Sequence, residues 1–362
     1  VLFFLCSELF FELINPYTSE LTLSNAPINF EKIFRLLEQH RMEGLAYSVL
    51  LSHKMQCYFP KRFLELLRVK YQNNIRHYEF VRASISYLAK LFPASGPKYG
   101  FLKGAYLIPE VYLRGQRTCN DIDILVNSSD VSVFQRILQN NGFVQGHYQR
   151  ETDTIITATR REVINSRLNY GETIPFIKRF GDSNTILEVD INFTVDYQAR
   201  DKNGIVRQLL NHLDTYVIND SLVPTLNKVG FLIHLCCHLY KEATVWDWMD
   251  KSAEIYKYCD IFVFISKFGN DKFYSEFLKA AKQLGLEKEC YFTLHNTSQI
   301  YPQLKTNRSL NSIIQALEPN DKSFLTTVVW PSQHKIFRYE IDFIDWLLCT
   351  NKKELLTENA NL

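Results

Sequence analysis

Two aspartates, Asp121 and Asp123, stand immediately before the apolar run Ile124-Leu125-Val126. A β-branched run of this kind predicts a buried strand, in which residues i and i+2 project to the same face. Two carboxylates held that close repel each other, and one keeps its proton unless a cation lies between them. Mg²⁺ suits such a pair, because it prefers oxygen ligands and is usually held by one or two carboxylates plus substrate phosphates. A solvated pair at the start of a surface strand is the alternative, and spacing alone leaves both open.

A glycine turn precedes the aspartates in the segment LKGAYLIPEVYL, residues 102–113. The pattern predicts the end of a short strand, a turn at Gly104 and then a helix. Backbone N–H groups at a helix N-terminus can hold a triphosphate. A phosphate-binding turn beside a metal-binding strand provides what in-line attack on the α-phosphorus of a nucleoside triphosphate requires.

Together these features resemble the nucleotidyltransferase superfamily with a DNA-polymerase-β-like core, and most closely an uncharacterised bacterial nucleotidyltransferase family. The motifs that carry the resemblance, in the family's order, are Leu102-Lys103-Gly104, Arg117 four residues before Asp121, Gly142-Phe143, VDINF at 189–193, FLIHLCCHLY at 231–240 and YCDIFVFI at 258–265. They span roughly residues 100–265. Two positions depart from the pattern: Ala105 stands where many members have Ser, and Asn192 where the family has His.

The resemblance implies an enzyme that moves a nucleoside monophosphate from a nucleoside triphosphate, expected to be ATP, to an acceptor and releases pyrophosphate. It implies one set of residues that bind Mg²⁺ and serve catalysis: Asp121, Asp123 and Asp190. It implies a second set that holds the nucleotide: Lys103, Gly104, Ala105 and Arg117. The alternative is a catalytically silent binding protein that keeps the fold, which the two departures favour and the intact aspartate pair opposes.

The third carboxylate and the arginine each leave a choice. Glu188 and Asp190 face the same side of the expected strand 185–195, so alternation does not choose between them, whereas the family pattern aligns Asp190. Arg117 is expected to pair with phosphate or with Asp123, or else to orient its loop.

The helices and strands expected around these residues indicate an α+β fold. A polymerase-β-like core, a mixed sheet with helices at 96–225, is expected between helical regions at 1–95 and 226–362. The clearest break is PASGPKYG at 93–100. Residues 145–184 fit either strand or helix, and the polar tail from 351 is expected to fray.

Composition restricts the partners and the compartment. The formal net charge of +2 argues against a long nucleic acid and gives no argument for a membrane surface. The expected acceptor is a small hydroxyl compound, a peptide or a protein, although the sequence does not choose among these and also leaves a tRNA end open. Eight cysteines without a C-x-x-C pair indicate reduced thiols in a cytoplasmic protein. No window approaches the roughly 18 apolar residues of a membrane helix. The apolar N-terminal segment is expected to form an amphipathic helix.

Two further clusters have a functional and a structural interpretation. His234 and His238 share one helix face, with Cys237 adjacent to it, and suggest zinc, but a nearby fourth ligand is lacking. A packed helix with histidines bonded to carbonyls or to Asp260 is therefore favoured. Trp246 and Trp248 could stack on a base, and a buried aromatic turn is the favoured alternative.

Overall fold

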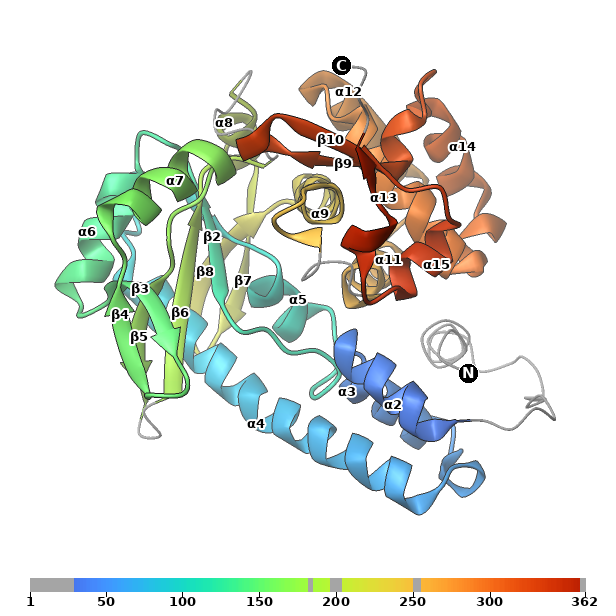
Figure 1. The fold of residues 1–362 in the computed structure, drawn as a ribbon. Helices are drawn as coiled ribbons and strands as arrows, with labels where there is room; N and C mark the ends of the chain where they lie inside the picture. The colour runs from blue at the N-terminus through green and yellow to red at the C-terminus, as the bar shows by residue number, and fades with distance from the viewer. Residues whose placement is uncertain (1–28, 182–184, 196–203, 250–254, 359–362) are drawn as a thin grey trace.

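The structure, a computed structural model, describes residues 29–181, 185–195, 204–249 and 255–358. A large sheet lies on one side of the molecule, a long helix runs along its lower edge, and a group of C-terminal helices lies on the other side (Figure 1). The amphipathic helix expected near the N-terminus lies outside the described residues.

Eight strands form the large sheet in the order β4-β3-β5-β6-β2-β1-β8-β7. Their bounds are β1 Tyr99–Phe101, β2 Ile122–Val126, β3 Val144–Gln149, β4 Thr154–Thr157, β5 Phe176–Phe180, β6 Thr185–Asn192, β7 Leu213–Ile218 and β8 Ser221–Leu226. The pairs β2–β6 and β1–β8 are parallel, whereas the other neighbours are antiparallel. The predicted α+β class with a mixed sheet is therefore confirmed.

The segment that fitted either strand or helix contains both. It forms β3, β4, helix α7 (Arg160–Tyr170) and β5. Thr159 begins α7 with a reciprocal cap in which Thr159 and Glu162 each bond the other's backbone N–H. Gly171 ends the helix in the left-handed region, where a Cβ would lie 1.8 Å from Thr194 Oγ1. The turn after α7 therefore packs too closely against the end of β6 for any side chain.

Three helices form the N-terminal region: α2 (Phe30–Gln39), α3 (Glu43–Ser52) and α4 (Lys61–Leu91). Pro60 stands directly before α4. Helix α4 packs against α3, α5 (Gly104–Glu110) and β8, so it joins the N-terminal helices to the sheet.

The C-terminal region is mostly helical. Its helices are α9 (Lys228–Thr244), α11 (Ile255–Phe268), α12 (Asp271–Leu284), α13 (Glu287–Ile300), α14 (Arg308–Leu317) and α15 (Phe343–Leu348). The core that precedes them also contains the helices α6 (Val131–Asn140) and α8 (Ile205–Leu210). Helix α9 lies between the sheet and the other C-terminal helices (Figure 1). A small sheet follows, made of β9 (Thr327–Trp330), β10 (Lys335–Arg338) and β11 (Thr357–Glu358). Because β11 pairs with β10, the expectation of a fully frayed tail is wrong for residues up to 358.

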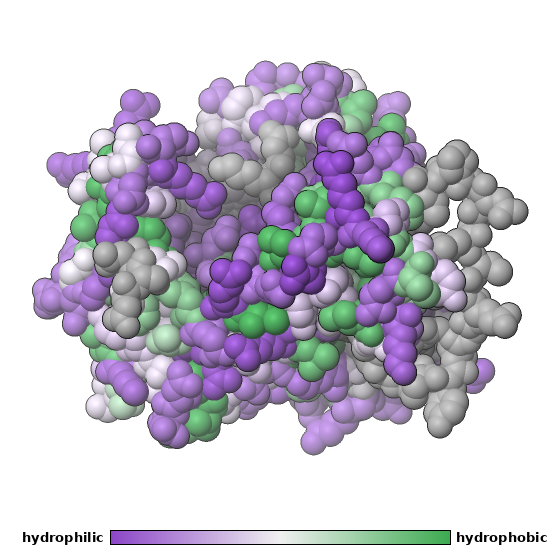
Figure 2. Space-filling model, turned by 90° about the horizontal axis from the view of Figure 1, so that it is seen from below, coloured by the Kyte–Doolittle hydropathy of each residue, from purple (hydrophilic) through white to green (hydrophobic). Residues whose placement is uncertain are grey.

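One hydrophobic cluster includes residues of all three regions, from Leu37 through Ile124 to Leu347. A second, smaller cluster lies under the three-stranded sheet around Val328 and Trp346. Figure 2 shows polar and apolar residues interspersed on the face seen from below. Among the described residues, the structure contains no helix with the length and apolar character needed to cross a membrane. The boundaries near 95 and 225 stay a prediction, since the core is continuous across them.

Candidate functional site

The carboxylates of β2 and β6 lie in one row. The two strands run parallel, with Asp123 opposite Asp190 and Leu125 opposite Asn192. By alternation, Asp121 and Glu188 project to the same face one pleat earlier. The sheet thus gathers four carboxylates from two segments that are far apart in the sequence.

Two hydrogen bonds fix the side chain of Asp123 within this row. Its side chain is buried, and its Oδ1 accepts hydrogen bonds from Lys103 Nζ at 2.7 Å and from Asn192 Nδ2 at 3.1 Å. Lys103 reaches Asp123 from the turn after β1, where its φ of 45° lies in the region that favours glycine. Asn192, which the sequence showed only as a departure from a family pattern, thus has a definite role in fixing Asp123.

Burial and mutual repulsion raise the pKa of the other carboxyls. Burial first and then the charge of Asp123 raise the pKa of Asp121 to about 6. Burial first, and then the charges of Asp121 and Asp123, raise the pKa of Glu188 to about 7 and hold that of Asp190 well above its ordinary value. For Lys103, burial opposes the charged form, but Asp123 and Asp121 outweigh it, so the pKa of its ammonium is raised.

These groups fit a divalent cation. Asp190 Oδ1 is buried and has no hydrogen-bond partner among the described residues, and a cation would relieve both this orphaned oxygen and the repulsion. Within the described ranges, no three His, Cys, Asp or Glu side chains already stand as a ligand set. Mg²⁺ is commonly held by one or two carboxylates together with substrate phosphates, so Asp121 and Asp123 could hold it.

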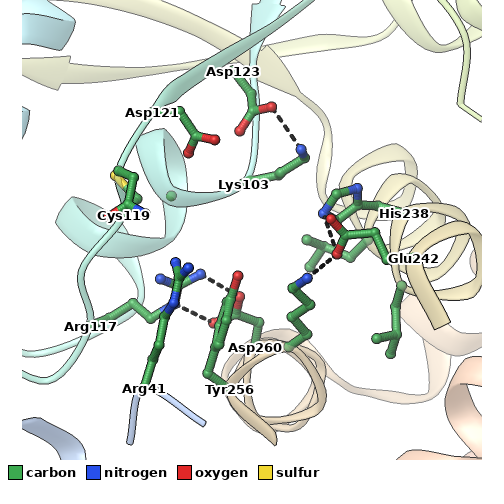
Figure 3. A pocket seen from close by; sticks show the side chains of 15 residues that line it. Arg41, Lys103, Arg117, Cys119, Asp121, Asp123, His238, Glu242, Tyr256 and Asp260 are labelled. Atoms are coloured by element: carbon green, nitrogen blue, oxygen red, sulfur yellow. Dashed lines mark hydrogen bonds and ion pairs between the residues drawn. The ribbon is translucent and has the colours of Figure 1, made fainter. Parts of the chain in front are cut away.

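A cavity of about 200 Å³ opens beside the aspartates. Asp121 and Asp123 lie at one end with Lys103 (Figure 3). Arg41 and Arg117 lie at the opposite end. Its walls come from the core, from α9 and α11, and from the corner between α2 and α3. The residues that line it are Arg41, Lys103, Gly104, Arg117, Cys119, Asn120, Asp121, Asp123, Leu235, His238, Leu239, Glu242, Tyr256, Lys257 and Asp260.

Arg117 lines this cavity but does not pair with Asp123. Its Nε and one terminal nitrogen donate to the two oxygens of Asp260, each at 3.0 Å, and its guanidinium lies 4.1 Å from the centre of the Tyr256 ring. Tyr112 also donates to Asp260, at 2.8 Å. Pairing with Asp123, one of the alternatives for Arg117, is therefore wrong, since Asp260 on α11 binds Arg117 at the same end of the cavity (Figure 3).

Replacing Asp260 by alanine is expected to destabilise the fold by about 3–5 kcal/mol, because it leaves the buried Arg117 without its counter-ion. Urea unfolding measures this difference. Asp260→Leu combined with Arg117→Met should recover much of the loss, since it removes both charges. Glu340→Ala, at an exposed carboxylate with an ordinary backbone, is the control. A loss below 1 kcal/mol for Asp260→Ala would contradict a structural ion pair.

Helix α9 supplies the opposite wall, and its histidines differ from the expectation. His238 lies 3.3 Å from Glu242, which also pairs with Lys257 of α11. Both ring nitrogens of His234 are buried without a hydrogen-bond partner among the described residues, and burial lowers its pKa to about 3. Neither histidine bonds Asp260, so that part of the interpretation is wrong, whereas the packed helix itself is confirmed.

The two residues of the turn, Gly104 and Ala105, lie differently with respect to the cavity. Gly104 lines the cavity, and a Cβ there would lie 2.6 Å from Cys119 Cβ, so the turn needs glycine to approach the loop before Asp121. Ala105 is fully buried and outside the cavity lining, and its carbonyl accepts from the Tyr216 hydroxyl at 2.7 Å. The structure brings together Lys103, Gly104, Arg117 and the aspartate pair, but does not bring Ala105 to them.

The tryptophans lie outside the cavity lining. Trp246 stacks on Trp330 at 4.9 Å, and the Trp248 ring lies 4.7 Å from Tyr170. These contacts agree with the aromatic turn rather than with a platform for a base.

The N-terminal helices brace the loop that carries Arg117 and Cys119. Asn74 of α4 donates to the Gly115 carbonyl at 3.2 Å, and His77 Nε2 donates to the Cys119 carbonyl at 2.6 Å. A Cβ on Gly44 of α3 would lie 2.3 Å from the Gly115 carbonyl oxygen. Sequence reasoning missed this bracing, as well as the cavity residues Arg41, Tyr256 and Lys257, because a single sequence carries no signal for contacts between distant segments.

A comparison with known proteins identifies the family. The family described as "Uncharacterised nucleotidyltransferase" matches residues 26–302. No protein with a curated description matches the chain. Among solved structures, an antigenic nucleotidyltransferase-like protein from Paracoccidioides brasiliensis is 16% identical with a TM-score of 0.41, over 64% of this chain and 92% of that one.

Proposed function

The chain belongs to the family of uncharacterised nucleotidyltransferases, and from this premise we propose that it transfers a nucleoside monophosphate from a nucleoside triphosphate to an acceptor and releases pyrophosphate. The observation that supports this most is the row of Asp121, Asp123 and Asp190 on two parallel strands, with Asp121 and Asp123 opening into a cavity that also contains Lys103. ATP is the proposed donor.

Asp121 and Asp123 would hold Mg²⁺, with Asp190 beside them as the third carboxylate. When bound, the ion neutralises phosphate charge and supports in-line displacement. Lys103 is placed to neutralise phosphate charge as well, because Asp123 accepts from only one of the three N–H groups of its ammonium. Asp190, with its raised pKa, is the proposed acceptor of the proton that leaves the attacking hydroxyl.

Register favours Asp190 over Glu188 for that role. Asp190 is the direct neighbour of Asp123, whereas Glu188 is one pleat further from it, beside Asp121. Glu188 is therefore proposed to tune the charge of the site rather than to take the proton.

The acceptor is proposed to be a small hydroxyl compound or a peptide or protein side chain. The cavity of about 200 Å³ is smaller than the roughly 300–1,000 Å³ of typical ligand sites. It suits the phosphates and the metal, and the base and the acceptor would approach from its mouth. The cytoplasm is the proposed compartment, since all seven described cysteines are free thiols.

Incubation with each of the four nucleoside triphosphates, labelled at the α-phosphate, tests the proposal. Labelled product should appear with Mg²⁺ and a fractionated extract of small molecules or proteins, and be absent with EDTA. Mass spectrometry of the labelled fraction identifies the acceptor. If the folded protein binds no nucleoside triphosphate in calorimetry, a silent binding protein becomes the better description.

A further inference from the structure

The corner between α2 and α3 brings a side chain of the N-terminal region into the cavity. Helix α2 ends at Gln39, and Arg41 follows two residues later, with its backbone N–H donated to the Glu38 carbonyl at 3.1 Å. The Arg41 side chain lines the cavity at the end away from Asp121 and Asp123 (Figure 3). This arginine lies far before the motifs that point to the reaction.

The backbone of Arg41 has an unusual conformation. Its φ is 54°, in the left-handed region where helices usually end with glycine or asparagine. An arginine there is strained relative to glycine. Strain that persists beside a cavity points to a role for the side chain.

The corner is fixed to the C-terminal region at this point. His40 is fully buried, and its Nδ1 accepts the backbone N–H of Ile255 at 3.3 Å. The next residue of α11 is Tyr256, whose ring centre lies 5.5 Å from the guanidinium carbon of Arg41 and 4.1 Å from that of Arg117. The two guanidinium groups are therefore held in one neighbourhood around a single ring.

The charges that line the cavity are unevenly distributed. Arg41 and Arg117 lie at one end with the carboxylate of Asp260 (Figure 3), while Lys257 and Glu242 pair with each other and add no net charge. The opposite end has Lys103 against Asp121 and Asp123. One end thus attracts a cation and the other an anion, which is the polarity of a metal-bound phosphate chain.

Arg117 is well suited to hold phosphate here. Asp260 and the Thr118 carbonyl use three of its five N–H donors, so the guanidinium is fixed while two donors remain for a ligand. A guanidinium fork matches phosphate oxygens in a bidentate manner, which an ammonium does not do.

We infer that Arg41 and Arg117 form the site for the terminal phosphates of the donor nucleotide, the group that leaves as pyrophosphate; this rests on the proposed function. The acceptor oxygen bonds to the α-phosphorus while the bond from that phosphorus to the bridging oxygen breaks. The electron pair departs with pyrophosphate, and the proton of the acceptor goes to the Asp190 carboxylate. The two guanidinium groups neutralise the charge that develops on the leaving group.

Arg41→Gly tests this inference, because glycine suits the backbone and the variant should melt no earlier than wild type. We expect its dissociation constants for inorganic pyrophosphate and for MgATP to rise at least tenfold, with little change for AMP. Lys54→Gly is a matched control: Lys54 also has a φ of 54°, also follows a helix end, and is exposed away from the cavity. It should bind all three compounds like wild type.

Two results would overturn the inference. One is unchanged binding of pyrophosphate and MgATP by Arg41→Gly. The other is unchanged MgATP binding with lost turnover, which would assign the arginines to a phosphate on the acceptor. Pyrophosphate binding is measured without turnover, so Arg41-dependent binding in a protein that transfers no label would preserve this site and remove the proposed function.

Discussion

Asp121→Asn should weaken Mg²⁺-dependent binding of ATP by at least a hundredfold, about 2.8 kcal/mol, while stabilising the protein without ligand. The loss follows because the amide is a poor ligand for a hard cation. The gain follows because Asp121 and Asp123 repel each other in a buried row. Calorimetry with MgATP measures the first effect and urea unfolding the second.

The gain in stability should depend on pH. The pKa of Asp121 is raised from 3.8 to about 6, so below pH 4 the carboxyl is protonated in both the folded and the unfolded chain. As pH rises towards 6, the unfolded chain loses this proton first, and the wild-type protein loses stability relative to the variant. The difference should reach about 1–3 kcal/mol and stay constant above pH 6. A variant that is less stable than wild type at pH 7 would contradict the repulsion.

Asp123→Asn provides a contrast within the same pair. Asp123 is the counter-ion of Lys103, and both side chains are largely buried. Neutralising it should abolish MgATP binding too, but should destabilise the fold by about 3–5 kcal/mol. Adding Lys103→Met should restore most of that stability, because it removes the buried charge that Asp123→Asn leaves unpaired, and urea unfolding measures both changes.

Asp190→Asn should lower nucleotide transfer by at least a hundredfold, the usual scale for loss of a positioned general base. Binding of MgATP should stay within tenfold of wild type, about 1.4 kcal/mol, because Asp121 and Asp123 remain. Glu188→Gln is the matched control on the same strand face, and its effect on transfer should be much smaller. Rates of label transfer and calorimetry give both quantities.

The ranking of these two variants decides the assignment. A larger loss for Glu188→Gln would transfer the role to Glu188. If neither variant affected transfer, a third carboxylate would have no part in the reaction.

Local sequence patterns predicted many of the helices and strands, because residues close in sequence determine where such elements form. The strand after Asp121 and the helix after Gly104 both depend on residues within a few positions of one another. The mixed segment 145–184 was ambiguous because β4 and α7 have little buried surface to impose a period.

The sequence alone did not predict the contacts between segments that are far apart in the chain. The partner of Arg117 is 143 positions away. Arg41 reaches the cavity only because His40 anchors its corner to α11, and nothing near Arg41 in the chain indicates that contact. Asn192 was a mere departure from a pattern until its bond to Asp123 gave it a role.

The pairing of Arg117 with Asp260 also determines when this part of the chain can fold during synthesis on the ribosome. At about 5–20 residues per second, the ribosome needs on the order of ten seconds to add the 143 positions between them. During that interval the emerging sheet lacks the counter-ion for a cation that it must bury, so the loop before Asp121 should stay solvated. Nucleotide binding should therefore begin only after α11 has left the ribosome, and a nascent chain stalled before that point should be the species most in need of a chaperone.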